Sequence, residues 1–271
     1  MSKTDFDLNW DYLRASKVML KDSDTVNLVL VGCGGTGSWL APAVARVGRL
    51  LRDSRGLDVR INFVDPDLVE EKNVYRQNFS NAEIGESKAF ALAFRYGLSW
   101  GMPIVANPRR LAEGKRWLPG GYEQTTVFLG CVDRASARQE IRDSMVGGDW
   151  WIDAGNEADN GQVLIGCKGE MPKEPFKLPG YCSWLPLPSL QHPELLQGSR
   201  SDGDSDLGIS CAELALRDSQ GMAINQRMAA EAADYLVRLL ITRNLQKMAT
   251  YIDLASGVSR STYITQQAVF P

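Results

Sequence analysis

The stretch Gly32-Cys33-Gly34-Gly35-Thr36-Gly37 decides the fold, because it joins a β-type run to a helical pattern. The run before it, Val26-Asn27-Leu28-Val29-Leu30-Val31, is rich in β-branched and aliphatic residues. After it, apolar residues recur at helical spacing from Trp39 to Leu51, and we expect Pro42 in the first turn, where a proline is tolerated. Strand, glycine turn and helix in this order predict the start of a Rossmann-like unit.

Further strand-like runs alternate with helical segments along the chain. They lie at residues 60–64, 126–129, 150–153 and 162–165. This alternation predicts the α/β class, with a Rossmann-like, mostly parallel sheet and helices on both faces. Two late runs, at 250–254 and 261–265, predict a closing hairpin and hence a C-terminal antiparallel extension.

The 271 residues are expected to form a single domain, 1–271. We expect an N-terminal extension at 1–25 and a C-terminal hairpin and tail at 248–271. Between them, residues 168–209 are rich in Pro, Gly, Ser and Asp and predict a mobile crossover-type loop, above all at 199–206. A long core-facing helix should follow, marked by Met222, Met228, Ala232, Tyr235, Leu236 and Leu239.

Composition excludes several classes of function. A net charge of -3 gives no reason to expect a nucleic acid or membrane partner, and the short basic run at 109–116 is typical of a solvated surface face. Five cysteines without a CxxC pair argue against a disulfide scaffold and against structural zinc. The polar N-terminus and the lack of a long apolar run favour a cytoplasmic protein. The single histidine, His192, is expected in an exposed loop, so histidine-based catalysis is disfavoured.

The glycine cluster indicates an anion site. Gly32, Gly34, Gly35 and Gly37 let the backbone turn tightly and approach a ligand, and the following helix directs free N–H groups and its dipole towards a phosphate. The same pattern satisfies the dinucleotide fingerprint G-x-G-x-x-G. A nicotinamide or flavin dinucleotide therefore remains an alternative at this point.

The residues after the second strand favour a triphosphate. Asp65, at the strand end, can accept hydrogen bonds from a ribose. It is followed by Asn73-Val74-Tyr75-Arg76-Gln77 and by Lys88. Arg76 and Lys88 have no obvious task in hydride transfer, whereas the β- and γ-phosphates of ATP need cationic partners. We therefore expect Asn73, Arg76, Gln77 and Lys88 to bind ATP.

Two further residues are candidates for chemistry, each with an ordinary structural alternative. Asp133 follows a later strand and can hold Mg²⁺ beside the phosphates, or it can cap the helix that starts near Ala135. Cys211 stands between a loop and a helix, where a thiol can be nucleophilic, or it can be a buried small apolar residue.

Together these motifs resemble the adenylation domain of the ThiF/MoeB/ubiquitin-activating superfamily. The resemblance rests on the glycine cluster, Asp65, the Asn-x-x-Arg-Gln run from Asn73, the Ile-Gly pair before Lys88, and Cys131-Val132-Asp133 with Arg138-Gln139-Glu140 after it. It implies ATP-dependent adenylation of a carboxylate. Asp65 would bind the ribose, and Asn73, Arg76 and Lys88 the phosphates. Asp133 would bind Mg²⁺, and Cys211 would match a cysteine that in many members accepts or relays the acyl group.

The chain is most similar to the ThiF-like proteins of PRTRC systems, on residues 63–67, 153–163 and Ser210-Cys211. This implies a small ubiquitin-like β-grasp protein as partner, activated at its C-terminal carboxylate, and a homodimer. The chain departs from zinc-binding members, which carry two CxxC pairs, so we expect no zinc. The arginine that many members present to the partner subunit's ATP has one nearby counterpart, Arg14, in a sequence context that does not match.

Two other functions remain open on the sequence. One is an NAD(P)-dependent oxidoreductase on the same Rossmann start, disfavoured by Arg76 and Lys88 and by the lack of a proton-relay histidine. The other is a non-catalytic scaffold that holds ATP and a partner without turnover, because binding and catalysis use the same residues.

Overall fold

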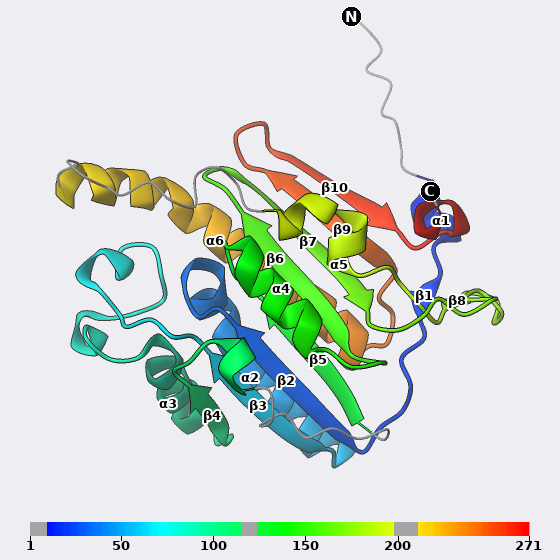
Figure 1. The fold of residues 1–271 in the computed structure, drawn as a ribbon, viewed down its shortest axis with the longest axis horizontal. Helices are drawn as coiled ribbons and strands as arrows, with labels where there is room; N and C mark the ends of the chain where they lie inside the picture. Colours follow the sequence, from blue (N-terminus) through cyan, green and yellow to red (C-terminus); the bar gives the residue numbers. More distant parts are fainter. Residues whose placement is uncertain (1–9, 115–123, 198–210, 271) are drawn as a thin grey trace, which may run out of the picture.

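A computed structural model describes residues 10–114, 124–197 and 211–270, without the side chains of 113, 114, 211–220 and 222. Its centre is an eight-stranded sheet (Figure 1). In spatial order the strands are β10 (Val258–Tyr263), β9 (Lys247–Asp253), β7 (Asn160–Cys167), β6 (Trp150–Asn156), β5 (Gln124–Gly130), β2 (Thr25–Val31), β3 (Asp58–Val64) and β4 (Ile104–Asn107). The five strands from β6 to β4 are parallel, and β7, β9 and β10 are antiparallel. The predicted α/β fold with an antiparallel C-terminal extension is confirmed.

Helices cover both faces of this sheet (Figure 1). Leu28 and Leu30 of β2 lie in a core shared with α2 (Gly35–Arg55), α3 (Lys88–Trp100) and α6 (Cys211–Leu240). Val29 and Val31 point the other way, into a core shared with α4 (Ala135–Ser144) and with Leu187, which precedes α5 (Pro188–Gln191). Strict alternation along one strand, with both sides apolar, is what a doubly covered parallel strand requires.

The long helix α6 packs into the first of these cores. Met228, Ala232, Tyr235, Leu236 and Leu239 are buried, as predicted from their spacing, while the side chain of Met222 lies outside the described part. No helix of the described residues is long and apolar enough to cross a bilayer.

Short elements complete the chain, namely α1 (Asp11–Arg14), β1 (Lys17–Val18), η1 (Glu71–Asn73), η2 (Asn81–Glu83), η3 (Leu111–Gly114), β8 (Tyr181–Cys182), η4 (Pro193–Leu196) and α7 (Gln266–Val269). β1 pairs with β8 in a second, two-stranded parallel sheet, so the N-terminal segment lies against the segment that follows β7. The stretch 199–206, for which we predict mobility, lies outside the described residues.

The predicted position of Pro42 is wrong. α2 begins at Gly35, which places Pro42 well inside the helix, where it cannot donate to the carbonyl of Ser38 four residues earlier. That carbonyl instead accepts a hydrogen bond from the side-chain amide of Asn78, at 3.3 Å. The Ser38 hydroxyl also accepts a hydrogen bond from the backbone N–H of Asn78, at 2.9 Å. Asn78 therefore occupies the position that Pro42 leaves open beside the helix.

Candidate functional site

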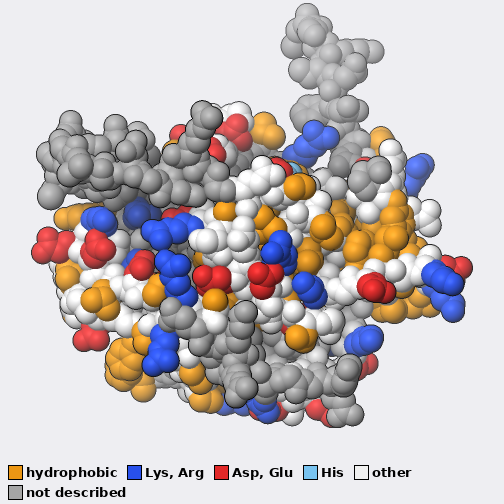
Figure 2. Space-filling view, viewed as in Figure 1, with side chains coloured by type: hydrophobic (Ala, Val, Ile, Leu, Met, Phe, Trp, Pro, Cys, Tyr) orange, Lys and Arg blue, Asp and Glu red, His pale blue; other side chains and the backbone are white. Residues whose placement is uncertain are grey.

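Nine of the eleven predicted site residues line one cavity of about 880 Å³ at the carboxyl ends of β2, β3 and β5. Gly37 does not line it, and the side chain of Cys211 lies outside the described part. Parallel strands direct their carboxyl ends to the same edge, which is why segments distant in sequence converge here. The residues that line the cavity include these nine of those predicted: Gly32, Gly34, Gly35, Asp65, Asn73, Arg76, Gln77, Lys88 and Asp133. Towards the left of Figure 2, where β2 and β5 end, Lys and Arg side chains gather with Asp and Glu among them.

The glycine loop leaves no room for side chains at its ends. A Cβ on Gly37 would stand 1.8 Å from the carbonyl oxygen of Gly32. Gly32 itself has a φ of +86°, and a Cβ there would stand 2.4 Å from the carbonyl oxygen of Cys131. The loop therefore packs backbone to backbone against the end of β5, and α2 begins directly at the cavity with N–H groups that lack intrahelical partners.

Asp65 fastens this loop to the segment that follows β3. Its carboxylate accepts the N–H of Cys33 at 2.6 Å and the N–H of Asp67 at 2.8 Å. Burial raises the pKa of Asp65, and the two backbone donors together with the charge of Lys88 oppose the rise. Each carboxylate oxygen keeps a second lone pair, so the predicted contact with a ribose is compatible with these bonds.

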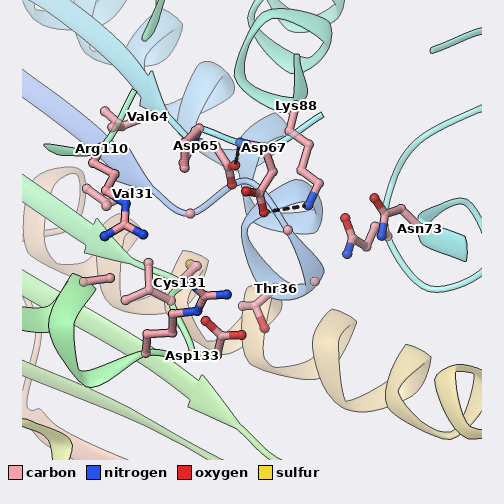
Figure 3. A pocket seen from close by; sticks show the side chains of 18 of the residues that line it. Val31, Thr36, Val64, Asp65, Asp67, Asn73, Lys88, Arg110, Cys131 and Asp133 are labelled. Atoms are coloured by element: carbon pink, nitrogen blue, oxygen red, sulfur yellow. Dashed lines mark hydrogen bonds and ion pairs between the residues drawn. The ribbon is translucent and has the colours of Figure 1, made fainter. Parts of the chain in front are cut away.

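Lys88 is the buried cation of the cavity. It begins α3, and its ammonium lies 3.2 Å from the carboxylate of Asp67, as Figure 3 shows. The Lys88 side chain is only 8% exposed, whereas that of Asp67 is 64% exposed. Asp67 was not singled out from the sequence, because its partner stands 21 positions later in the chain.

The segment that carries Arg76 is held against α2. The carbonyl of Arg76 accepts the indole N–H of Trp39 at 3.0 Å, and Gln77 is buried. Asn73, also buried, accepts the N–H of Glu70 at 2.9 Å and so caps η1 while it faces the cavity. The predicted phosphate contacts of these residues stay predictions.

Asp133 lies on the β5 side of the cavity, across from Lys88 (Figure 3). The alternative role as a helix cap is excluded, because Arg134 occupies the N-cap of α4 and no side chain caps that end. Arg138, one turn into α4, donates to the backbone carbonyl of Asp133 at 3.1 Å and pairs with Asp153. Asp133 is exposed, so its carboxylate is accessible from the cavity.

Two arginines in the basic run, Arg109 and Arg110, contribute to the site in a way that the sequence did not indicate. Both are exposed, as expected for a solvated face at 109–116, but they also line the cavity. Residues 115 and 116 of this run lie outside the described part. Arg109 and Arg110 follow β4, a strand that we did not predict and that ends at the same edge as β3. Arg110 also stands 4.0 Å from Glu140 of α4.

A polar network behind the glycine loop was also missed. The hydroxyl of Thr36 donates to the side-chain oxygen of Asn156 at 2.8 Å and contacts that of Asn225 at 3.2 Å. Asn225 comes from α6, and a Cβ on Gly35 would stand 2.6 Å from its amide oxygen. No local signal marks Asn225, because its partners are about 190 residues away.

A second cavity, of about 560 Å³, adjoins the first and shares Asp133, Gly155 and Asn156 with it. Tyr251 lines it, and the hydroxyl of Tyr251 lies 2.7 Å from His192, whose other ring nitrogen lies 2.7 Å from Glu194. His192 lies in a loop position between α5 and η4, as predicted, but its side chain is only 25% exposed and connects η4 to β9.

The cysteines whose side chains are described lack the exposure and the lowered pKa of a nucleophilic thiol. Cys33, Cys167 and Cys182 are buried and Cys131 is half-buried, and burial raises the pKa of Cys167 to about 11. Cys211 begins α6, but its side chain lies outside the described part. Among described residues, no three His, Cys, Asp or Glu side chains form a metal-binding group, and the prediction of no zinc stays a prediction.

Fold and site define a Rossmann-like α/β protein of the nucleotide-binding kind. The chain belongs to the ThiF family, whose model matches residues 12–171, more than half of its length. No curated protein sequence matches it.

Solved structures with this fold are distant in sequence. Escherichia coli MccB with succinimide has 16% identity and a TM-score of 0.56, covering 88% of this chain and 63% of MccB. MccB with AMPCPP and MccA has 15% identity and a TM-score of 0.54, with 94% and 65% coverage. PaaA has 15% identity and a TM-score of 0.50, with 88% and 64% coverage. The chain thus spans just under two thirds of the length of these proteins.

Proposed function

We propose that this protein binds ATP and transfers its adenylyl group to a carboxylate. The observation that carries the proposal is that one cavity combines the start of α2 with the side chains of Arg76 and Lys88. A helix N-terminus favours a phosphate, and added cations favour a chain of phosphates over a single one. Arg109 and Arg110, which line the same cavity, extend the positive charge along it. MccB, a distant relative in fold, is described in complex with ATP.

The reaction needs little covalent help from the protein. The carboxylate oxygen attacks the α-phosphorus, the bond to the β-phosphate oxygen breaks, and pyrophosphate leaves with the electron pair. No base is required, because a carboxylate is already ionised at neutral pH. Arg76 and Lys88 would stabilise the charge that moves onto pyrophosphate, and Asp67 holds Lys88 in place for this.

The residues present also fit a magnesium ion. Mg²⁺ keeps several waters and is usually bound by one or two carboxylates together with substrate phosphates, and Asp133 supplies one exposed carboxylate in the cavity. Asp133 would hold the ion, which when bound supplies charge screening for the phosphates.

The acceptor carboxylate would reach the nucleotide through the second cavity, which meets the first at Asp133 and Gly155. In keeping with the resemblance to PRTRC ThiF proteins, we infer that it is the C-terminus of a small ubiquitin-like β-grasp protein in the cytoplasm. MccB, described with N-formylated MccA, is a distant parallel. The homodimer, an Arg14 contribution to the partner subunit and acyl transfer to Cys211 belong to the same proposal. Arg14 is exposed at the end of α1, and no described residue of α1 lines the cavity.

Thermal unfolding with different nucleotides tests ATP binding directly. At about one hundred times its dissociation constant, Mg·ATP should stabilise the fold by about 2.7 kcal/mol, a rise in Tm of roughly 5–10 °C for a chain of this size. A chelator should reduce the rise, and NAD⁺ should give none. A rise with NAD⁺ and none with Mg·ATP would contradict the proposal and favour the oxidoreductase.

Variants then separate binding from turnover. Lys88→Ala should abolish most of the rise with Mg·ATP, because it removes the buried cation, while Lys177→Ala, an exposed lysine, should leave it unchanged. With a candidate β-grasp protein present, pyrophosphate exchange into ATP should require Lys88 and Arg76. Binding without any exchange would identify a scaffold. Cys211→Ser should leave exchange intact and stop only a transfer that passes through a thioester.

A further inference from the structure

A buried ion pair stands behind Asp133, outside the residues assigned to ATP. The Nε of Arg138, on α4, lies 3.3 Å from both carboxylate oxygens of Asp153, on β6. The Arg138 side chain is 9% exposed and that of Asp153 is fully buried. Burying two charges is costly, and a well-packed apolar pair is often as stable or more stable. Fold stability alone therefore does not explain the pair.

Two glycines make room for the pair. A Cβ on Gly155 would stand 2.8 Å from an Nη atom of Arg138, and a Cβ on Gly130 would stand 3.2 Å from a carboxylate oxygen of Asp153. Gly130 ends β5 and Gly155 lies near the end of β6. A side chain at either position would therefore crowd the ion pair, at the edge of the sheet that forms the cavity.

The second contact of Arg138 shows what the pair can do. While Nε faces Asp153, Nη1 donates to the backbone carbonyl of Asp133 at 3.1 Å. The guanidinium is a rigid plane with donors on separate edges, so it can bind the Asp153 carboxylate and the loop between β5 and α4 at the same time. Asp133 lies in that loop and borders both cavities.

We propose that Arg138, with Asp153 as its buried counter-ion, is a positioning residue that fixes the loop carrying Asp133 for binding Mg²⁺ together with ATP. The inference rests on the proposed function. Groups that orient a metal ligand affect metal affinity about 10- to 100-fold when they are altered. A lysine at position 138 keeps the charge but offers a single ammonium group, which cannot span Asp153 and the Asp133 carbonyl in the same way.

The test is calorimetric titration of AMPCPP, an ATP analogue whose α–β linkage is not cleaved, with excess Mg²⁺ and with a chelator. For each protein the ratio of the two dissociation constants measures the gain from Mg²⁺. In Arg138→Lys the gain should fall about 10-fold relative to wild type, with the affinity in chelator unchanged. Arg142→Lys is the matched control on α4, because the Arg142 side chain is 37% exposed and pairs with Asp143 at the surface. Its gain should change less than about twofold.

A second variant tests the inference if Arg138→Lys does not fold. Arg138→Gln with Asp153→Asn removes both charges together, leaves no buried ion unpaired, and should show the same loss of gain. An undiminished gain in the folded variants overturns the inference. An equal loss of affinity with and without Mg²⁺ also overturns it, because Arg138 would then only maintain the fold. Wild-type protein that binds no AMPCPP, or binds it without a gain from Mg²⁺, would instead refute the proposed function on which the inference rests.

Discussion

Gly37→Ala is the change that most directly tests the geometry of the glycine loop. Gly37 lies in the first turn of α2, where a change from glycine to alanine normally improves helix stability by up to about 1 kcal/mol. Here the added Cβ would stand 1.8 Å from the carbonyl oxygen of Gly32. To restore an ordinary contact of about 3.5 Å, the loop would have to move by more than 1 Å.

The cost of this movement can be bracketed. Overpacking a tight site costs about 1–3 kcal/mol, and the upper end applies because the contact is with backbone rather than with a flexible side chain. After the gain in helix propensity, we expect a net loss of about 2 kcal/mol in the free energy of unfolding. This corresponds to a fall in Tm of roughly 4–8 °C.

Thermal unfolding with and without Mg·ATP provides the assay. Gly37→Ala should lower Tm and also lose most of the ATP-dependent rise, because the displaced loop no longer presents its N–H groups to the phosphates. Gly147→Ala is the control, since a Cβ there meets nothing within 4 Å. If Gly37→Ala unfolds at the wild-type temperature and responds normally to Mg·ATP, the close approach of Gly37 and Gly32 constrains neither stability nor ATP binding, and the reasoning is refuted.

Two further substitutions give independent outcomes. In Asp149→Asn the free energy of unfolding should fall less than in wild type as the pH rises from about 4 to about 6. The reason is that burial raises the pKa of Asp149 from 3.8 to about 6 in the folded protein. Across that range the folded state holds a proton that the unfolded chain has released, so wild-type stability falls as pH rises; equal slopes in urea titrations of both proteins would contradict this. Asn225→Asp should weaken ATP binding by roughly tenfold or more, because it sets a negative charge against Thr36 and Gly35 at the phosphate loop. Asn225→Ala is its uncharged comparison, and equal affinity of the two variants in calorimetry would place Asn225 too far from the phosphates to matter.

The strands and most of the predicted site follow from local signals. Continuous β-branched and aliphatic runs predict buried parallel strands, and residues at their carboxyl ends converge because the strands are parallel. This placed Asp65 and Asp133 at one edge of the sheet from sequence alone. The start of α2 was misjudged because residues 35–38 carry no apolar periodicity, so the pattern became visible only at Trp39.

Contacts between distant segments could not be predicted. β4 has only four residues, too few for its sequence to stand out as a strand, so the part that Arg109 and Arg110 after it take in the cavity was missed. Asn225 acts through α6, and its contacts depend on how that helix packs on α2. Arg138 stands in a motif, but its pairing with Asp153 depends on how α4 packs against β6, which the motif does not indicate.

Pro42 illustrates how a residue unsuited to a helix can serve the segment beside it. Because proline has no N–H, the carbonyl of Ser38 is left without its partner in the helix and accepts a hydrogen bond from Asn78 instead. Asn78 directly follows Arg76 and Gln77 in the chain. A helix with a complete hydrogen-bond ladder would offer that segment no such anchorage. The hydrogen bond that α2 lacks at Pro42 is thus replaced by one that fixes the segment carrying Arg76 and Gln77 beside the cavity.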